Sequence, residues 1–406
     1  MKNYGRNLNV GYAGIFATYW MVYGVIGSFG SAFLLNAGYS NSEIGIIFAV
    51  ASVISCFTQP ILADISDRSK KLNATSVAEI LSAALIILTG LLFVINHKSA
   101  ALFVIYALAM AWILALQPLF NSLCFRFEES GHHINFGICR SIGSLGYAVL
   151  VAVLGTLVEN SGMIVIPETS VLSLILLMIA LILTEKTFRK SKDEKGGKIT
   201  AGEVLQEEPA QDDINLLEFV KRNKLFVVLN LGIVLLFFQN YITNNYMFQI
   251  VEGVGGDAED MGRIFSVMAF IEMPGLFFFD NIRKKFNLKF LLRFASVNFV
   301  LKLAALTFAN SVAMVYAAHF FHIFSFSIFL AAIVAYINEI MEKGEAVKGQ
   351  ALYTASITVS SIFASIFGGI LLDISGPKMM LLISTLVAAF GTVVIWILIG
   401  KIGNNK

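Results

Sequence analysis

Five ionisable side chains lie inside otherwise hydrophobic stretches of this chain: Arg140, Glu272, Lys302, His319 and His322. A charged group at bilayer depth costs about 3 kcal/mol or more, so it usually faces a polar cavity or a partner. Arginine suits the binding of hydroxyl and carboxylate oxygens, because its fork of donors is rigid and always charged. Histidine takes up and releases a proton near neutral pH. These residues therefore predict a polar site for a ligand or a proton.

The composition is typical of a polytopic membrane protein. Of 406 residues, 57% are hydrophobic and 14% are charged, and the mean hydropathy is +0.78. The net charge of +2 is small and gives no indication of a nucleic-acid partner. No cleavable signal peptide is visible. The short polar start runs into a first apolar segment that is long enough to cross the membrane and remain there as a transmembrane helix. Cys56, Cys124 and Cys139 have no CxxC spacing, so we expect buried thiols and no disulfide or metal set.

Twelve apolar runs are each long enough to cross a bilayer, which takes about 20 helical residues. A polar segment, residues 185–223, separates six runs from six and contains KTFRKSKDEKGGK and QEEPAQDD, which predicts a charged cytoplasmic linker. We therefore predict an N-terminal six-helix bundle over 1–184 and a C-terminal one over 224–406. The predicted spans are 9–35, 43–63, 73–95, 100–125, 136–158, 164–184, 224–250, 260–280, 287–309, 312–338, 346–373 and 378–400.

The basic residues favour one orientation. With the N-terminus in the cytoplasm, nearly all lysines and arginines outside the spans fall on the inner side, and only Lys98, Arg263 and Lys378 fall on or near the outer side. This positive-inside bias predicts that both termini and the linker are cytoplasmic. We expect a multi-pass protein of a bacterial cell inner membrane that functions as a monomer.

The two predicted halves share a short element. GIIFAV, from Gly45 to Val50, matches GRIFSV, from Gly262 to Val267, and each span then runs into a basic turn. A repeat of this kind fits a 6+6 transporter, in which two halves rock about a central site.

The turn after the second span reads ADISDRSKK, from Ala63 to Lys71. It resembles the loop signature of the major facilitator superfamily, GxxxDRxGRK, with Ala63 and Ser69 in place of the two glycines. Asp67 and Arg68 lie at the predicted helix end, where a carboxylate that pairs with basic neighbours holds one gating state. The alternative is a plain basic turn with no gating role.

A closer resemblance covers essentially the whole chain. SEIGIIFAVASVISCFTQPILADISD, from Ser42 to Asp67, is similar to the second span of the lactose permease-like family of oligosaccharide:proton symporters. FGICRSIGSLGYA in residues 136–148 and the FxHxF segment in 320–324 also match. The resemblance implies an all-α membrane protein of twelve transmembrane helices, with pseudo-two-fold-related halves around a central cavity.

The resemblance implies roles for residues of the fourth and fifth spans. Arg140 matches the family's essential arginine, which clamps sugar hydroxyls, and Tyr147 matches a tryptophan that stacks on a pyranose ring. The two lie seven residues apart and so share a helix face. The arginine's acidic partner aligns near Asn121 or Ser122, which accept a hydroxyl but leave Arg140 unneutralised. The alternatives are an arginine that snorkels to the cytoplasmic face and a tyrosine that only packs.

Glu272, in the run FIEMPGLFFF, matches the family's membrane-embedded glutamate of the eighth span. The resemblance implies that it binds the sugar. Hydrocarbon disfavours a charged carboxylate, which suits a proton-linked site, and Pro274 frees carbonyls and bends the helix. The alternative is a carboxylate that is paired only for structure.

His319 and His322 are three residues apart and share a helix face, and Lys302 lies in the preceding span. By resemblance they stand at the family's proton site, but Ser325 replaces the carboxylate that carries the proton. We therefore expect His322 or Glu272 to carry it instead, in a protein that needs no cofactor besides H⁺. The two histidines have no evident third ligand for a metal.

The seventh span is rich in amides, in the stretch FFQNYITNNY. The family's two acids of this span align near Asn240 and Thr243. Amides suit a sugar, because they offer both donors and acceptors. Further candidates for hydroxyl binding are Gln239, Asn244 and Gln117.

These residues predict an importer of a di- or oligosaccharide that works by alternating access and proton symport. A nucleoside:proton symporter shares the architecture but should need more aromatic stacking. Drug efflux should need a largely apolar pocket, which the amide-rich seventh span argues against. A non-transporting sugar sensor would bind without moving the sugar. No phosphate-binding glycine loop, metal cluster or nucleophile–base pair points to an enzyme.

Overall fold

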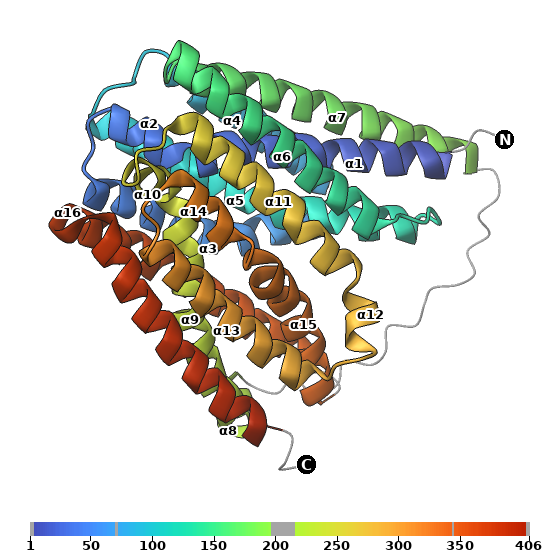
Figure 1. Cartoon of the computed structure of the whole chain (residues 1–406). Coiled ribbons are helices and arrows are strands. Elements are labelled where there is room, and N and C mark those ends of the chain that lie inside the picture. Colours follow the sequence, from blue (N-terminus) through green and yellow to red (C-terminus); the bar gives the residue numbers. More distant parts are fainter. Residues whose placement is uncertain (1–3, 70–71, 196–215, 343–344, 403–406) are drawn as a thin grey trace. The chain divides into compact units, whose positions relative to one another are not determined.

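The computed structural model describes residues 4–69, 72–195, 216–342 and 345–402, and every regular element in them is a helix. By their contacts these residues form two units (Figure 1). The first unit contains the described residues up to 195 together with Asp257–Ala269. The second contains residues 216–256 and the described residues from Phe270 onward.

Seven α-helices and one π-helical turn make up most of the first unit. Helix α1 packs along α6 and α7, α3 packs along α5, and α4 contacts both α5 and α7 (Figure 1). The elements are α1 (Tyr4–Tyr23), the π-turn η1 (Gly24–Ser28), α2 (Gly30–Asn36), α3 (Asn41–Arg68), α4 (Ala74–Leu91), α5 (Ala100–Glu129), α6 (Phe136–Ser161) and α7 (Val165–Lys195).

Side-chain caps fix where several of these helices begin. Ser40, Asn73, Ser99 and Asn135 each accept a hydrogen bond from the backbone N–H three residues on. At α3 the Glu43 carboxylate also accepts from the Ser40 N–H at 2.8 Å, which completes a capping box. The caps satisfy N–H groups that have no partner within the helix. Each of these helices therefore begins at a Ser or Asn that can be recognised in the sequence as a capping residue.

Buried tyrosines tie the first unit together. Tyr12 and Tyr19 of α1 donate to carbonyl oxygens of α5 at 3.0 and 3.2 Å. In return, Tyr106 of α5 donates to the Ile26 carbonyl within η1 at 2.8 Å. A π-turn shifts the backbone hydrogen-bond register, and this hydroxyl satisfies a carbonyl there. These bonds fix α1 and η1 against α5.

Helix α11 (Ala258–Phe277) begins in the first unit, where it lies close against α6. A Cβ on Gly262 would lie 2.3 Å from the Val151 carbonyl, and one on Gly155 would lie 2.6 Å from the Ala258 carbonyl. Only glycine permits this approach of two backbones. Thr156 of α6 also donates to Glu259 of α11 at 3.0 Å.

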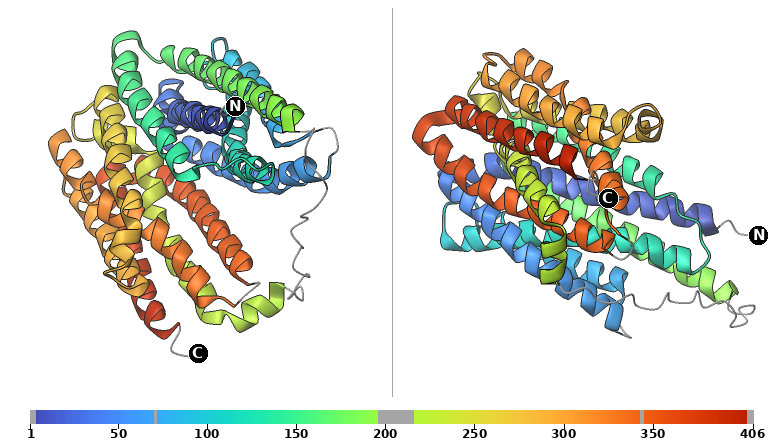
Figure 2. Two further views of the ribbon diagram at one scale, coloured as in Figure 1. Left: turned by 90° about the vertical axis from the view of Figure 1, so that its right-hand side faces the viewer. Right: turned by 90° about the horizontal axis from the view of Figure 1, so that it is seen from below.

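The second unit also consists of helices, and its core lies where α9, α13, α15 and α16 meet (Figure 2). Phe237 is central to that core, with ring contacts to Phe299, Phe329 and Tyr353. The remaining elements are α8 (Leu216–Arg222), α9 (Lys224–Asn245), α10 (Met247–Glu252), α12 (Phe279–Arg283), α13 (Leu288–Thr307), α14 (Val312–His319), the π-turn η2 (Ile323–Ser327), α15 (Ile328–Ile340) and α16 (Ala346–Lys401).

Ten helices in the described ranges are long and apolar enough to cross a membrane. One of them, α16, covers two predicted spans. A break at Gly376, which has a left-handed φ of 74°, and at Pro377 separates the two spans within it. The predicted span 260–280 corresponds largely to α11, which carries several charges. The twelve predicted runs are thus all accounted for by helices.

Two details differ from expectation. Helix α7 continues to Lys195, past residue 185 where the linker was predicted to begin, and residues 196–215 of that linker lie outside the described residues. All three cysteines are free, but Cys56 is exposed and only Cys124 and Cys139 are buried. The prediction that Cys56 is buried was wrong, because it lies on an outward face of α3.

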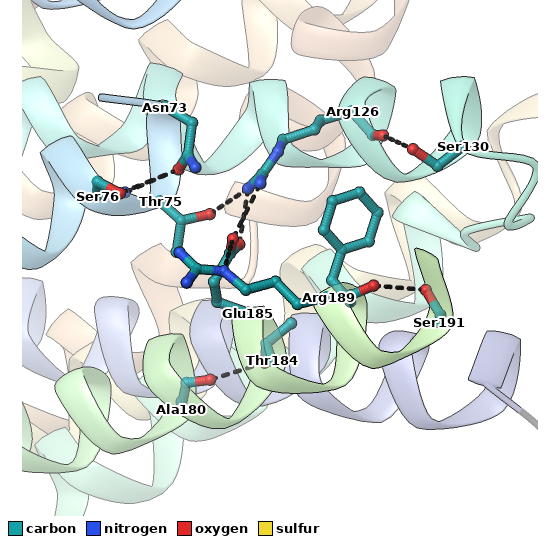
Figure 3. Close-up of polar contacts among 11 residues, drawn as sticks. Asn73, Thr75, Ser76, Arg126, Ser130, Ala180, Thr184, Glu185, Arg189 and Ser191 are labelled. Carbon is teal, nitrogen blue, oxygen red and sulfur yellow. Dashed lines mark hydrogen bonds and ion pairs between the residues drawn. The ribbon is translucent and has the colours of Figure 1, made fainter. Parts of the chain in front are cut away.

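An ion-pair network holds the ends of α4, α5 and α7 together (Figure 3). Arg126 of α5 binds both carboxylate oxygens of Glu185 at 2.8 and 3.0 Å, and it donates to Thr75 of α4 at 2.6 Å. Arg189 donates to the same carboxylate at 3.0 Å. The Arg126 guanidinium also lies 4.7 Å from the Phe188 ring. Three helices thus share one bidentate charge pair.

Candidate functional site

In the first unit, Arg140 lies on the second turn of α6 and is half-buried. Its guanidinium lies over the Trp20 ring of α1, 4.2 Å from the ring centroid. One guanidinium nitrogen donates to Ser144 Oγ, one turn further along α6, at 3.0 Å. Arg140 is therefore held by an aromatic face and a hydroxyl, and its position is set by two helices.

Glycine makes room for the Trp20 indole beside α6. A Cβ on Gly143 would lie 2.8 Å from Trp20 Cδ1. The indole also packs edge-on against Tyr23 and Tyr147, with ring centroids 5.3 and 6.5 Å away. Its Nε1 is buried and has no hydrogen-bond partner in the described part of the chain. An indole N–H is a donor only, so this atom is suited to bind a ligand oxygen.

Tyr147 lies two turns beyond Arg140 on α6. Its hydroxyl makes a 2.8 Å hydrogen bond with Ser28 Oγ at the end of η1. The π-turn therefore lies directly at the predicted binding residues, as such turns frequently do at functional sites. The predicted pair, Arg140 and Tyr147, is joined through Trp20, which contacts both.

In the second unit, Glu272 of α11 and His322 approach each other. Their Oε2 and Nε2 atoms are 3.9 Å apart, and the two side chains are 21% and 5% exposed. The His322 ring also stacks on Phe326 with centroids 5.3 Å apart. The distance allows an ion pair when the imidazole is protonated. The structure thus brings together the two residues predicted to carry a proton.

Lys302 of α13 and His319 of α14 lie beside this pair. Both are fully buried, and α13 packs against α14 and η2. The Lys302 ammonium interacts electrostatically with His319 and His322. His319 Nδ1 lies 2.7 Å from the Val315 carbonyl, so this nitrogen carries a hydrogen and Nε2 is left to titrate. Within the described ranges no three His, Cys, Asp or Glu residues are placed to hold a metal.

The amides of α9 are also buried. Gln239 is completely buried, and neither of its side-chain polar atoms has a hydrogen-bond partner among the described residues. The same holds for Asn240 Oδ1. Thr243 instead donates to carbonyls of its own helix at 3.0 and 3.1 Å. Gln239 and Asn240 therefore have hydrogen-bonding capacity that the described residues do not use.

Other predicted residues have simpler surroundings. Arg68 pairs with Asp64 at 2.5 Å, and both side chains are largely exposed, while the Asp67 side chain lies outside the described part. On α5, Ser122 donates to the Leu119 carbonyl of its own helix at 2.8 Å, and Asn121 is half-buried. The gating role of Asp67 and Arg68 and the binding role of Asn121 and Ser122 stay predictions.

The sequence analysis did not single out Trp20, Ser28 or Ser144. A signal for the first was present in the aromatic run YWMVY of the first span, followed by the two glycines of GVIGS. Nothing in the sequence says which aromatic residue would face Arg140, because that depends on how α1 packs on α6.

A model of the MFS_1 like family matches residues 12–383. The chain belongs to this family. This transporter is 23% identical over 340 residues to the uncharacterized transporter YwbF of Bacillus subtilis (strain 168), and the match covers 82% of this chain and 79% of that protein. It is 27% identical over 281 residues to a maltose permease of Geobacillus stearothermophilus, and the match covers 66% of this chain and 65% of the permease.

Solved structures with the same fold are also transporters. The nucleoside transporter NupG superposes with a TM-score of 0.72 at 15% identity, over 97% of this chain and 98% of NupG. A bacterial homolog of the human lysosomal transporter Spinster gives 0.69 at 12% identity, over 100% and 99% of the two chains. The POT family transporter PepTSo gives 0.71 at 10% identity, over 100% and 98% of the two chains.

These similarities confirm an all-α membrane protein of the major facilitator type. The transporter is a multi-pass protein of the lipid bilayer that moves a small molecule by secondary transport. Its relatives are transporters and not enzymes.

Proposed function

We propose that this transporter imports a di- or oligosaccharide by proton symport with alternating access, without a cofactor and as a monomer. The observation that carries the proposal is the Arg140 guanidinium stacked on Trp20, beside the Tyr147 ring. The similarity to a maltose permease supports a sugar as substrate. The relatives named above are all transporters, so the substrate class is the part that needs testing.

Arg140, Trp20 and Tyr147 together offer what a sugar needs. A pyranose has apolar C–H faces that stack on aromatic rings and hydroxyls that donate and accept hydrogen bonds. The guanidinium supplies fixed donors, and the buried Trp20 Nε1 supplies another donor without a partner of its own in the described chain. We propose the same role of hydroxyl binding for Asn240, Glu272 and His322 in the second unit.

For proton coupling we propose Glu272, His322, His319 and Lys302. The carboxylate lies 3.9 Å from the imidazole, so a proton on His322 creates an ion pair and its loss removes one. His319 Nε2 can gain a proton without breaking the bond that Nδ1 makes to Val315. These groups replace the acid that is missing at Ser325, whose hydroxyl donates to the Phe321 carbonyl at 2.9 Å.

Nucleoside uptake is the second candidate. The fold similarity to the nucleoside transporter NupG favours it. The aromatic cluster around Arg140 would suit a nucleobase as well as a sugar ring, because both present a face that stacks on aromatic side chains.

An uptake screen in proteoliposomes separates the two candidates. Radiolabelled mono-, di- and trisaccharides are compared with purine and pyrimidine nucleosides, with Arg140→Ala and Glu272→Ala as controls. Saturable uptake of a di- or trisaccharide that both variants lose is the expected result. Uptake of nucleosides alone would overturn the sugar proposal, and binding of a sugar with no uptake would indicate a sensor.

Proton coupling needs a separate measurement. When the sugar from the screen is added to energy-depleted cells, the external medium should become more alkaline as protons enter with the sugar. Robust sugar uptake without alkalinisation would rule out proton symport for this transporter.

A further inference from the structure

The Lys302 ammonium in the second unit has no counter-charge among the described residues. The side chain is fully buried, and Nζ has no hydrogen-bond partner in the described residues. The contact on one side is the Phe299 ring, 5.7 Å from Nζ to the centroid. A buried ammonium without a counter-charge costs several kcal/mol, on the order of a broken buried ion pair. A negatively charged ligand would offset this cost.

Two further nitrogens around Lys302 also lack partners in the described chain. They are His319 Nε2 and His322 Nδ1, in residues that are 0% and 4% exposed. His319 is the last residue of α14 and His322 directly precedes η2, and α13 with Lys302 packs against both elements. Three buried nitrogens from two packed segments thus have unused hydrogen-bonding capacity in one region.

The described residues supply no counter-charge to the Lys302 ammonium. Ser325 directs its hydroxyl to the carbonyls of Phe321 and His322, at 2.9 and 3.3 Å, and offers no negative charge. The carboxylate nearby is that of Glu272, which lies 3.9 Å from the Nε2 side of His322. Nδ1, the other ring nitrogen of His322, has no hydrogen-bond partner among the described residues. The described ion pairs include none for Lys302.

We propose that Lys302, His319 and His322 bind a carboxylate of the substrate, which makes this transporter a carrier of an acidic sugar such as a uronic-acid-containing disaccharide. The proposal rests on the proposed sugar function and specifies its substrate class. The ammonium supplies the charge for the carboxylate, His322 Nδ1 donates a hydrogen bond in the appropriate tautomer, and His319 Nε2 donates when that ring is protonated.

The amides of α9 distinguish a sugar acid from a small anion such as chloride or acetate. Phe237 and Phe299 pack with ring centroids 5.8 Å apart. Asn240 lies one turn after the first, and Lys302 lies one turn after the second, so each shares a helix face with its phenylalanine. A cationic group on α13 and a buried amide on α9, both with polar atoms unsatisfied in the described chain, therefore flank one packed pair of rings. A sugar acid uses both parts, whereas chloride or acetate uses only the cation.

The test compares disaccharides that end in a uronic acid with neutral counterparts that carry a hydroxymethyl group in place of the carboxylate. Binding to the purified full-length protein is measured by isothermal titration calorimetry at constant salt. At least one uronate should bind about tenfold more tightly than its neutral counterpart, a difference of about 1.4 kcal/mol, because a hydrogen bond to a charged group is stronger than one between neutral groups. In Lys302→Met the ratio should fall to about one, while Lys302→Arg should keep a preference for the acid.

A second variant, His319→Gln, covers the case that Lys302→Met does not fold, and it should also reduce the preference. The proposal is overturned if no uronate binds more tightly than its neutral counterpart, or if the preference survives in both variants. It is equally overturned if chloride or acetate alone binds and the sugar carboxylate adds nothing. Uptake of neutral disaccharides without a preference for acids would contradict the acidic substrate and leave the proposed sugar transport intact. Uptake of nucleosides and of no sugar would contradict both.

Discussion

Arg140 is the residue on which the substrate proposal depends most. Its guanidinium carbon lies over the Trp20 ring, 4.2 Å from the ring centroid, and one of its nitrogens donates to Ser144 at 3.0 Å. An arginine that only extended toward water would not need Trp20 beneath its guanidinium, nor Gly143 to leave space for the indole. The planar shape of the guanidinium is therefore used as well as its charge.

Replacing Arg140 with lysine should reduce uptake of the transported sugar about tenfold or more, because an ammonium lacks the flat face and the fork of donors. Initial uptake rates in proteoliposomes measure this. The matched control is Ser141→Ala on the same turn, because that hydroxyl only donates to the Gly137 carbonyl of its own helix at 2.9 Å. Uptake at the wild-type rate in Arg140→Lys would show that the guanidinium does not take part in transport.

At the scale of elements, α7 depends on a charge pair at its end. Glu185 is 7% exposed, and its carboxylate accepts from Arg126 and Arg189. This pair links α7 to α5 and, through Thr75, to α4 (Figure 3). The helix continues to Lys195, so the first residues of the predicted linker are part of a rigid element.

Replacing Glu185 with glutamine should lower the free energy of unfolding on the order of 3 kcal/mol, because it leaves the partly buried Arg126 without a counter-charge. The midpoint of thermal unfolding in detergent measures the effect. The control is Glu342→Gln, which breaks the exposed pair with Arg222 at 2.7 Å and should shift the midpoint far less. Equal shifts in the two variants would mean that the buried pair contributes no more to stability than the exposed pair does.

At the scale of the whole molecule, the distribution of basic residues predicts the orientation in the membrane. The lysines and arginines outside the predicted spans gather on the side of the two termini and of residues 185–223. Charges of this kind resist translocation, so they stay in the cytoplasm.

A fluorescent protein fused after residue 406 should therefore fluoresce in cells, and alkaline phosphatase fused at the same point should be inactive, because that enzyme folds only outside the cytoplasm. A phosphatase fusion truncated at Lys98, between the third and fourth predicted spans, is the control and should be active. The opposite pattern of activity would reverse the predicted topology.

The sequence by itself determined the helices of this protein and the residues that can do chemistry. In a bilayer every backbone polar group must be bonded within the chain, so long apolar runs have to be helices, and caps such as Ser40 and the break at Gly376 and Pro377 are local signals. The sequence also pointed to Arg140, Glu272 and His322, because ionisable groups are rare in such runs.

Only the tertiary structure decided which groups meet. Trp20 lies over Arg140 from 120 residues away, and His322 lies 3.9 Å from Glu272 on another helix. The two π-turns, η1 and η2, lie beside these contacts and were not visible in the sequence. The physical reason is that helix formation depends on neighbours along the chain, whereas these contacts depend on which faces of the helices pack together.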